Sequence, residues 1–342
     1  MKAARHHQHG GPDVLVYEDI PEPKIRPDQI LVRVRACALN HLDLFVRAGI
    51  PGIKIPMPHI LGSDIAGEVV QAGELCERVQ PGWRVALSPG LSCRQCDQCV
   101  SGNDNLCRRY ALFGYAVDGG NAELVAAPEY SAIRIPDDFT FEEAAAAPLV
   151  FLTAWHMLMA RARLQPGEDV LVLSASSGVG SAAIQIAKMF QCRVIATAGG
   201  DAKLAKAREL GADHAIDHYQ QNISAEVRRI TEKRGVDVVF EHVGVATWQR
   251  SLESLAPAGR LVTCGATTGY DAGIDLRFLF SKQWSLLGSF MGTMGELRQV
   301  LQFVFRRQLK PVIDRVYPLA EIRAAHERLE KKEQFGKVIV TP

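Results

Sequence analysis

The spacing of apolar residues changes near Pro148, and the two parts of the chain predict different kinds of structure. Before that point, short runs rich in β-branched residues at 29–37, 66–73 and 83–88 are separated by Pro and Gly. Such runs predict the strands of an irregular β domain. After it, strand-like runs alternate with segments of helical spacing. This alternation predicts βαβ units with a parallel sheet.

The second part predicts six strands joined by crossover helices, which is the pattern of one doubly wound sheet. The expected strands cover 170–175, 193–198, 213–216, 236–243, 260–266 and 284–290. The expected helices cover 178–190, 201–210, 222–234 and 246–256, with a further helix near 295–308. The residues after that helix end in a strand-like tail, which we expect to return to the first domain.

The chain is long enough for two domains that each bury a core of their own. We expect a β domain made of residues 1–150 and 293–342, and an α/β domain made of residues 151–292. With 39 Lys and Arg against 38 Asp and Glu, the formal net charge is +1, and no basic stripe interleaved with aromatic residues occurs. This balance argues against a nucleic-acid partner and favours a small-molecule substrate.

The sequence predicts neither a membrane span nor a secretory leader. No apolar run reaches the roughly 18 residues that a span requires, and the first residues lack the apolar core of a signal peptide. We therefore expect no membrane partner and a cytoplasmic location.

Four cysteines, Cys93, Cys96, Cys99 and Cys107, follow the spacing C-x2-C-x2-C-x7-C. This spacing predicts a tetrahedral Zn²⁺ site. Because sulfur fills every ligand position, the ion would stabilise a loop and leave no place for substrate. Disulfides or an iron–sulfur cluster are the alternatives. The other four cysteines lie singly in apolar segments, as reduced thiols in a reducing compartment do.

The segment 170–190 reads strand, small-residue turn and helix, which is the order that a dinucleotide site requires. Within the turn, Ser177, Gly178, Val179 and Gly180 precede an amphipathic helix, although only Gly180 matches the three-glycine motif. We expect their N–H groups to hold a pyrophosphate. The alternative is an ordinary strand-to-helix turn that needs small residues only for packing. Further cofactor contacts are expected at strand ends, from Val243, Gly244, Gly265, Ala266 and Phe290.

The second strand of this sheet lacks the acid that usually holds the ribose hydroxyls of NAD. The nearest acid, Asp201, is interpreted as the N-cap of the following helix. An open turn at Gly199 with Lys203 and His218 nearby suits a 2′-phosphate, which favours NADP(H) over NAD(H). Lys203 could equally be a solvated helix residue.

In order and spacing, several segments resemble the medium-chain dehydrogenase/reductase superfamily. These segments are 10–23, 38–49, 58–70, 119–128, 144–155 and 176–188, together with the cysteine loop. The resemblance implies a GroES-like β domain that carries a zinc lobe at about 90–110, plus a Rossmann dinucleotide-binding domain. It also implies an active site in the cleft between the two.

Zinc alcohol dehydrogenases of that superfamily hold a second, catalytic zinc, and the matching positions here are Asn40, Ser63 and 149–151. An amide and a hydroxyl, with Asp64 nearby, make a poor zinc site. The positions that match the family's proton relay are Leu42 and Phe45, so the relay is missing as well.

Asn40 and Asp43 resemble the Asn and Asp of the quinone oxidoreductase branch, whose segment lines the nicotinamide and substrate cleft. The resemblance thus implies Asn40 and Asp43 as catalytic residues, Thr153 as a catalytic residue that also borders the nicotinamide, and His41 as a pyrophosphate contact. The structural alternatives are that Asn40 caps a turn and that Asp43 pairs with Arg47.

Without a catalytic metal, alcohol oxidation has no evident base, whereas an enone or quinone is already electrophilic at its β-carbon. The resulting hypothesis is an NADP-preferring oxidoreductase that delivers hydride to the activated C=C of an enone, enal or quinone. An alcohol dehydrogenase or aldehyde reductase is the first alternative, and a non-catalytic dinucleotide-binding or structural protein is the second. The resemblance also suggests a homodimer along the sheet edge near 284–290, or a homotetramer.

Overall fold

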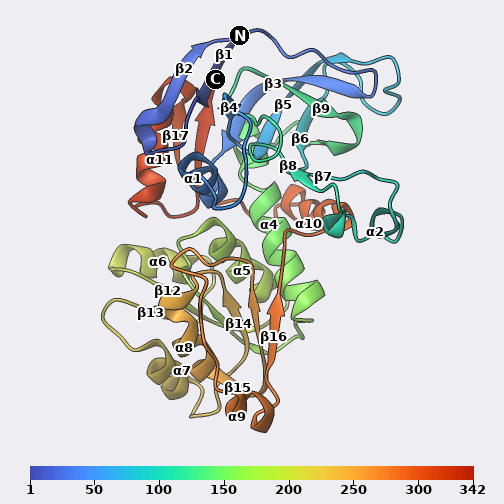
Figure 1. The fold of residues 1–342 in the computed structure, drawn as a ribbon. Coiled ribbons are helices and arrows are strands. Elements are labelled where there is room, and N and C mark those ends of the chain that lie inside the picture. Colours follow the sequence, from blue (N-terminus) through green and yellow to red (C-terminus); the bar gives the residue numbers. More distant parts are fainter. The chain divides into compact units, whose positions relative to one another are not determined.

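The computed structural model describes residues 1–342, which form two compact units. Unit 1 contains residues 1–149 and 293–342, and unit 2 contains residues 150–292. Figure 1 shows that unit 1 is formed by blue, green and red segments, which come from both ends of the sequence, whereas the colours of unit 2 are continuous.

Unit 1 is built from two main sheets. The smaller one has the order β2 (Leu15–Asp19), β1 (Lys2–His6), β4 (His59–Ile60). The larger one has the order β10-β6-β5-β3-β18-β17, with β9 also paired to β3. Its strands are β3 (Gln29–Ala38), β5 (Asp64–Ala72), β6 (Arg84–Leu87), β9 (Leu124–Pro128), β10 (Ala132–Arg134), β17 (Ile313–Pro318) and β18 (Lys337–Thr341). A short third sheet pairs β7 (Gly90–Leu91) with β8 (Ala111–Leu112).

The strand β18 joins the two sequence segments of unit 1. It pairs antiparallel with β3, where Ile339 faces Ala38, and parallel with β17. Both β3 and β5 are buried over most of their length. Their apolar side chains form one core with Val338 and Val340, and those of β3 and β5 are Ile30, Val32, Val34, Ile65 and Val69. The helices of unit 1 are α1 (His41–Ala48), α2 (Asp97–Val100), α3 (Phe141–Ala145), α10 (Met294–Phe305) and α11 (Ile322–Glu330).

Unit 2 contains one parallel sheet of six strands in the order β13-β12-β11-β14-β15-β16. The strands are β11 (Asp169–Val172), β12 (Arg193–Ala198), β13 (His214–Asp217), β14 (Val236–Glu241), β15 (Leu255–Thr263) and β16 (Ser285–Gly288). Numbered along the unit, this is the order 3-2-1-4-5-6 of a doubly wound dinucleotide-binding sheet. The predicted fold class is confirmed.

Helices connect these strands and cover the sheet (Figure 1). They are α5 (Gly178–Met189), α6 (Asp201–Glu209), α7 (Ile223–Ile230), α8 (Val245–Ser254) and the unpredicted α9 (Leu276–Ser281). The helix α4 (Pro148–Trp155) continues into a π-helical segment, His156–Arg161. One prediction was wrong: Asp201 is the first residue of α6, and the N-cap is Gly200, whose φ of 81° suits glycine.

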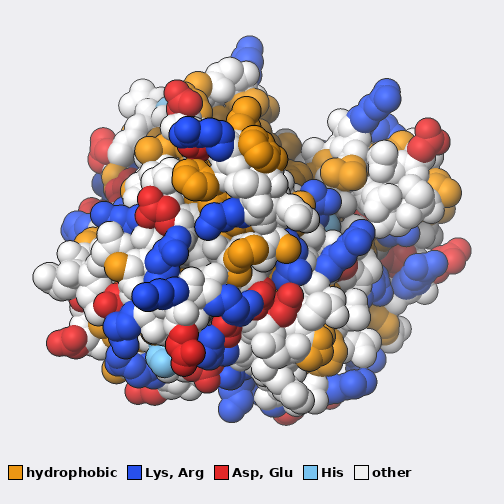
Figure 2. Space-filling view, turned by 90° about the horizontal axis from the view of Figure 1, so that it is seen from below, with side chains coloured by type: hydrophobic (Ala, Val, Ile, Leu, Met, Phe, Trp, Pro, Cys, Tyr) orange, Lys and Arg blue, Asp and Glu red, His pale blue; other side chains and the backbone are white.

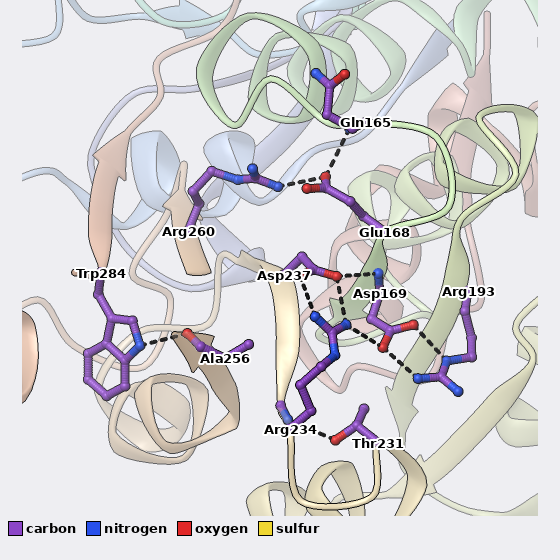
Figure 3. Close-up of polar contacts among 11 residues, drawn as sticks. Gln165, Glu168, Asp169, Arg193, Thr231, Arg234, Asp237, Ala256, Arg260 and Trp284 are labelled. Atoms are coloured by element: carbon purple, nitrogen blue, oxygen red, sulfur yellow. Dashed lines mark hydrogen bonds and ion pairs between the residues drawn. The ribbon is translucent and has the colours of Figure 1, made fainter. Parts of the chain in front are cut away.

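An ion network joins neighbouring strands at the amino edge of the parallel sheet (Figure 3). The carboxylate of Asp169, at the start of β11, accepts from Arg193 Nε at 2.6 Å and from Arg234 Nη2 at 2.7 Å. Arg234 Nη1 also donates to Asp237 Oδ1 at 2.7 Å, and Asp237 is the second residue of β14 (Val236–Glu241). These charges lie at the edge opposite to the carboxyl ends of the strands, where ligands of such sheets bind. They therefore hold the strands together without entering the candidate cofactor site.

Figure 2 shows Lys and Arg side chains interspersed with Asp and Glu over the face that is seen, which agrees with a formal net charge of +1.

Candidate functional site

The four cysteines of the zinc lobe converge on one point. Their sulfur atoms all lie within 4.8 Å of one another. The Sγ atom of Cys96 lies 3.6 Å from Cys99 Sγ and 3.8 Å from Cys107 Sγ. Four ligands at about 2.3 Å from a tetrahedral centre lie about 3.8 Å apart. All four cysteines are free of disulfides. The residues therefore fit a four-coordinate, thiolate-bound Zn²⁺.

Backbone N–H groups prepare these sulfurs for a cation. Cys93 N and Arg109 N donate to Cys107 Sγ at 3.4 and 3.3 Å, and Cys96 N donates to Cys93 Sγ at 3.4 Å. The backbone N–H of Gln95, followed by other donors, lowers the pKa of Cys93 to about 5. Because N–H donors stabilise the thiolate form, they favour the metal-binding protonation state at Cys93, whereas burial raises the pKa of Cys99 to about 11.

A second polar group lies in unit 1 around Asn40, Asp64 and Lys337, and we call it the Lys337 network; the sequence did not single out Lys337. Asn40 precedes α1, Asp64 begins β5 and Lys337 begins β18. The Lys337 ammonium donates to Asn40 Oδ1 at 2.6 Å and to Asp64 Oδ2 at 2.8 Å. Asn40 Nδ2 donates to Asp64 Oδ2 at 3.0 Å. All three side chains are at least nine-tenths buried.

The positions that the sequence matched to catalytic-zinc ligands lie at or next to this network. Their polar atoms form hydrogen bonds with other groups of the protein. Asp64 Oδ1 accepts from Leu149 N at 2.8 Å, and Ser63 Oγ donates to Phe113 O at 2.7 Å. Among the residues of the whole chain, only the four cysteines bring three or more His, Cys, Asp or Glu ligand atoms together. The residues here do not fit a second zinc ion.

Asp43 is buried beneath the first turn of α1. Its Oδ2 accepts from Asn40 N at 2.6 Å and its Oδ1 accepts from Gly62 N at 2.8 Å. Burial raises the pKa of Asp43 to about 6, although the two N–H donors oppose this shift. The structural alternative of a pair between Asp43 and Arg47 was wrong, because Arg47 instead binds Glu330 and Gly10 O. Asp43 ties the start of α1 to the segment before β5.

Asn40 is the N-cap residue of α1 and forms a capping box with Asp43, as the structural alternative predicted, and its side-chain amide also contacts Asp64 and Lys337. His41, the first residue of α1, is half-buried. The contact of His41 with a pyrophosphate stays a prediction.

The predicted dinucleotide turn of unit 2 has the geometry that a pyrophosphate site needs. Ser177 is the N-cap of α5, and its Oγ accepts from Gly180 N at 2.9 Å. A Cβ on Gly180 would lie 2.3 Å from Ser174 O, so only glycine allows this close approach of helix and strand. Gly178 and Val179 form the first turn of α5, where N–H groups have no partner within the helix. These residues fit a bound pyrophosphate.

The carboxyl ends of β14 and β15 lie side by side. A Cβ on Gly244 would lie 3.0 Å from Ala266 Cα, and one on Gly265 would lie 3.1 Å from His242 O. Gly244 has a φ of 96°. The predicted contacts Val243, Gly244, Gly265 and Ala266 therefore lie together at the edge where cofactors bind to such sheets.

A buried carboxylate that sequence reasoning missed holds this edge. Glu241 Oε1 accepts from Val243 N at 2.6 Å and from Gly244 N at 3.0 Å. Its Oε2 accepts from Ser251 Oγ at 2.6 Å. The available signal was an acid at the end of β14, directly after the apolar run 238–240.

The carboxyl ends of β12 and β13 form the predicted 2′-phosphate region. A Cβ on Gly199 would lie 3.2 Å from His218 Nε2, so this glycine and histidine are neighbours. Lys203 lies in the first turn of α6, half-buried. Asp217, which the sequence did not single out, accepts from Gly200 N at 3.2 Å. The N–H donors of Tyr219 and Gly200 lower its pKa, so this region contains an ionised carboxylate.

Thr153 and Phe290 also belong to unit 2. Thr153 lies in α4, and its hydroxyl is buried without a hydrogen-bond partner. Such an orphaned group is costly unless something binds it. Phe290, just after β16, has 54% of its surface exposed. The unpartnered hydroxyl makes Thr153 a candidate ligand contact.

Comparisons with known proteins agree with this geometry. Two family models match, an alcohol dehydrogenase GroES-like domain over residues 26–137 and a zinc-binding dehydrogenase over residues 178–306. The NAD-dependent alcohol dehydrogenase of Sulfolobus acidocaldarius is 32% identical, with 99% of both chains covered. The chain belongs to the medium-chain dehydrogenase/reductase superfamily.

Other members of this superfamily are similar over the same length. A quinone oxidoreductase of Pseudomonas aeruginosa is 32% identical over 98% of this chain and 97% of its own. A crystal structure of an NAD-dependent alcohol dehydrogenase matches with a TM-score of 0.97 and 43% identity, and 100% of both chains are covered. As in the superfamily, unit 1 is a GroES-like domain and unit 2 a Rossmann domain.

The family membership makes this dehydrogenase/reductase an NAD(P)-dependent oxidoreductase that acts on a small molecule. None of its helices is both long and apolar enough to cross a membrane.

Proposed function

We propose that this chain reduces the activated C=C of an enone, enal or quinone without a catalytic metal. The observation that carries the proposal is the Lys337 network, in which the polar atoms of Asn40 and Asp64 bind a lysine ammonium at 2.6 and 2.8 Å. A site arranged in this way offers no set of metal ligands and no free base. Alcohol oxidation needs help with a proton whose pKa is near that of water, about 16.

Conjugate reduction needs less from the protein. When bound, the reduced nicotinamide supplies a hydride to the β-carbon of the substrate, and the C=C electron pair moves onto the carbonyl oxygen as an enolate. A proton from solvent then completes the saturated ketone. The chain has to orient the two molecules and to offer hydrogen-bond donors to the enolate oxygen. The unpartnered hydroxyl of Thr153 is one such donor.

NADPH is the proposed cofactor in preference to NADH. Lys203 and His218 lie at the carboxyl ends of β12 and β13, and β12 itself ends without an acid. A cationic side chain there would bind a 2′-phosphate. Asp217 opposes this preference because its carboxylate would repel the same phosphate. We therefore propose a moderate preference that Asp217 limits.

An alcohol dehydrogenase is the second candidate, since an alcohol dehydrogenase structure matches this chain with a TM-score of 0.97 at 43% identity. The two functions predict different results. Purified enzyme should consume NADPH with enones and quinones and leave simple aldehydes unchanged. It should hold one zinc per chain, bound by the four cysteines. Two zinc ions per chain, together with turnover of aldehydes or alcohols alone, would favour the second candidate.

A homodimer joined along β16 is the proposed assembly. β16 is the last strand of the parallel sheet, so one of its edges is unpaired in the chain. Exposed aromatic side chains, Phe278, Phe280 and Phe290, lie in sequence on either side of it. Apolar edge strands pair readily with a second copy. Light scattering should give a dimer mass, and Leu287→Lys in β16 should give monomers. A tetramer that survives this change would contradict pairing through β16.

A further inference from the structure

His242 lies where the strand order of the parallel sheet reverses. The chain runs from β11 outward to β12 and β13, and then returns to β14 on the other side of β11. Ligands of doubly wound sheets bind in the crevice outside the carboxyl ends of the strands at such a reversal. His242 directly follows Glu241, the last residue of β14. Its position is therefore that of a residue beside the candidate cofactor site of unit 2.

The ring of His242 connects β11 with α5. Backbone pairing of β11 and β14 extends to Leu173 N, which donates to Phe240 O at 3.2 Å. Beyond this bond, His242 Nε2 lies 3.0 Å from Leu173 O and 3.3 Å from Ser177 Oγ. His242 and Ser177 are each 8% exposed. The imidazole thus joins the end of β11 to the N-cap residue of the candidate pyrophosphate turn.

These contacts decide the tautomer of His242. A carbonyl oxygen only accepts hydrogen bonds, so Nε2 must carry the hydrogen that binds Leu173 O. A ring nitrogen that carries a hydrogen has no free lone pair, so Nε2 also donates to Ser177 Oγ and shares its hydrogen between the two oxygens. Burial lowers the pKa of His242, which keeps the ring neutral. His242 therefore acts on Ser177 as a hydrogen-bond donor and brings no positive charge.

The tautomer in turn fixes the role of the Ser177 hydroxyl. A hydroxyl has two lone pairs and one hydrogen. One lone pair of Ser177 Oγ accepts from Gly180 N at 2.9 Å, and the other accepts from His242 Nε2. Both acceptor positions are then occupied, and the hydroxyl hydrogen is left for a further partner. Toward a ligand, Ser177 can therefore act only as a donor.

A hydroxyl that can only donate suits the pyrophosphate of a dinucleotide. Phosphate oxygens are anionic and accept hydrogen bonds, and bonds to charged acceptors are stronger than neutral ones. The N–H groups of Gly178 and Val179, in the first turn of α5, have no partner within the helix and offer donors at the same place.

We propose that His242 is a positioning residue of the cofactor site, which holds the Ser177 hydroxyl so that its hydrogen faces the bound pyrophosphate. The inference rests on the nicotinamide cofactor of this family and on the predicted place of its pyrophosphate at α5. It does not depend on which substrate is reduced. His242 acts through Ser177 and not by contact with the phosphates.

A double-mutant cycle separates this role from simple packing. His242→Phe keeps an aromatic ring but removes the donor, and Ser177→Ala removes the hydroxyl. His242→Gln is the matched variant that keeps a donor, because Nε2 of glutamine is as many bonds from Cβ as Nε2 of histidine. Should His242→Phe not fold, His242→Met removes the donor in the same way.

The control for loss of a helix cap is Asn222→Ala. The side chain of Asn222 caps α7 by accepting from Ala225 N at 3.0 Å. Like Ser177→Ala, this variant removes one N-cap bond of unit 2, so it should lower the unfolding temperature. It should leave the cofactor Kd unchanged, because no role in the cofactor site is proposed for α7.

Titration of NADPH and of NADH fluorescence without substrate gives the two cofactor Kd values. His242→Phe should raise both about fivefold or more, because both cofactors contain the pyrophosphate and a charge-assisted bond is weakened. His242→Gln should bind both cofactors like wild type. In the Ser177→Ala background, His242→Phe should change neither Kd by more than about twofold, since its partner is already absent.

Unchanged binding by His242→Phe, or equal losses in the presence and absence of the Ser177 hydroxyl, would overturn the proposal, because His242 would not act through Ser177. Binding by His242→Gln as weak as that by His242→Phe would also overturn it, and so would a loss confined to NADPH or a wild-type chain that binds neither cofactor. If the wild-type enzyme binds NADPH but reduces no activated alkene, the function proposed above fails, and the titrations still decide the role of His242.

Discussion

The zinc lobe and the Lys337 network are two polar clusters of the same unit, and only one of them suits a metal ion. The four cysteines present like groups that converge within 4.8 Å and that carry no cation of their own. The Lys337 network alternates donors and acceptors, and it contains an ammonium at 2.8 Å from Asp64. A cluster of thiolates needs a cation to be stable, whereas the network already has one. Family likeness to zinc enzymes therefore does not extend equally to both clusters.

The largest effect is expected from removal of one zinc ligand. Cys96→Ser removes one of the four thiolates on which zinc binding depends, and this binding is worth about 10 kcal/mol or more. The zinc content should therefore fall from one per chain to near zero. Metal analysis and thermal unfolding measure this change. Cys76→Ser is the control, since Cys76 lies outside the cluster, at the margin of the unit 1 core, and its Sγ donates to Gln29 O at 3.4 Å. A folded, stable Cys96→Ser enzyme without hydride transfer would mean that the lobe takes part in catalysis.

The network should be sensitive to loss of one charge. Asp64→Asn leaves the buried Lys337 ammonium without its anion and should lower the free energy of unfolding by about 3 kcal/mol. Urea unfolding measures it. Glu68→Gln on the same strand removes the partner of Arg35 in an exposed pair, and should cost less than about 1 kcal/mol. Equal losses in the two variants would show that the network is no more than a surface ion pair.

Within the turn around Asn40, Asp43 contacts no ammonium, and burial raises its pKa to about 6. A folded-state pKa above the unfolded value of about 3.9 means that the folded chain binds more protons between these values. The stability due to Asp43 is thus present at low pH and is lost as the pH rises toward 6. The unfolding free energy of wild type minus that of Asp43→Asn should fall by about 2 kcal/mol from pH 4.5 to 7. A pH-independent difference would show an ordinary carboxylate.

The smallest effect is expected at the cofactor region of unit 2, which neither cluster contains. Lys203→Ala should raise the KM for NADPH about tenfold, equivalent to about 1.4 kcal/mol, and leave the KM for NADH unchanged. Lys206→Ala, on an exposed position of the same helix, is the control. Equal changes in the KM values for NADPH and NADH would show that Lys203 does not contact the 2′-phosphate. Asp217 would then be the residue that decides cofactor choice.

The sequence predicted what depends on local spacing and missed what depends on distant contacts. The strand 193–198 was confirmed at its exact ends, and the helix predicted at 178–190 differs by one residue. Alternation, a capping serine and cysteine spacing are local signals. Lys337 follows Asp64 by 273 residues, so no local pattern connects them. Asp201 was misplaced by one position because Gly200, with a φ of 81°, already turns the chain.

The pairing of β18 with β3 affects the order in which the parts of the protein can fold during synthesis. Residues 150–292 are continuous and can fold as they emerge from the ribosome, because domains generally fold as units during synthesis. The strand β3 has to wait for residues 337–341 before its neighbour β18 exists. A nascent chain halted before residue 337 would contain a complete Rossmann unit, but the larger sheet of unit 1 would lack β18. Asp64 would then lack the Lys337 ammonium. Chaperone demand should therefore concentrate on the early segment, whose unpaired strand edge is exposed longest.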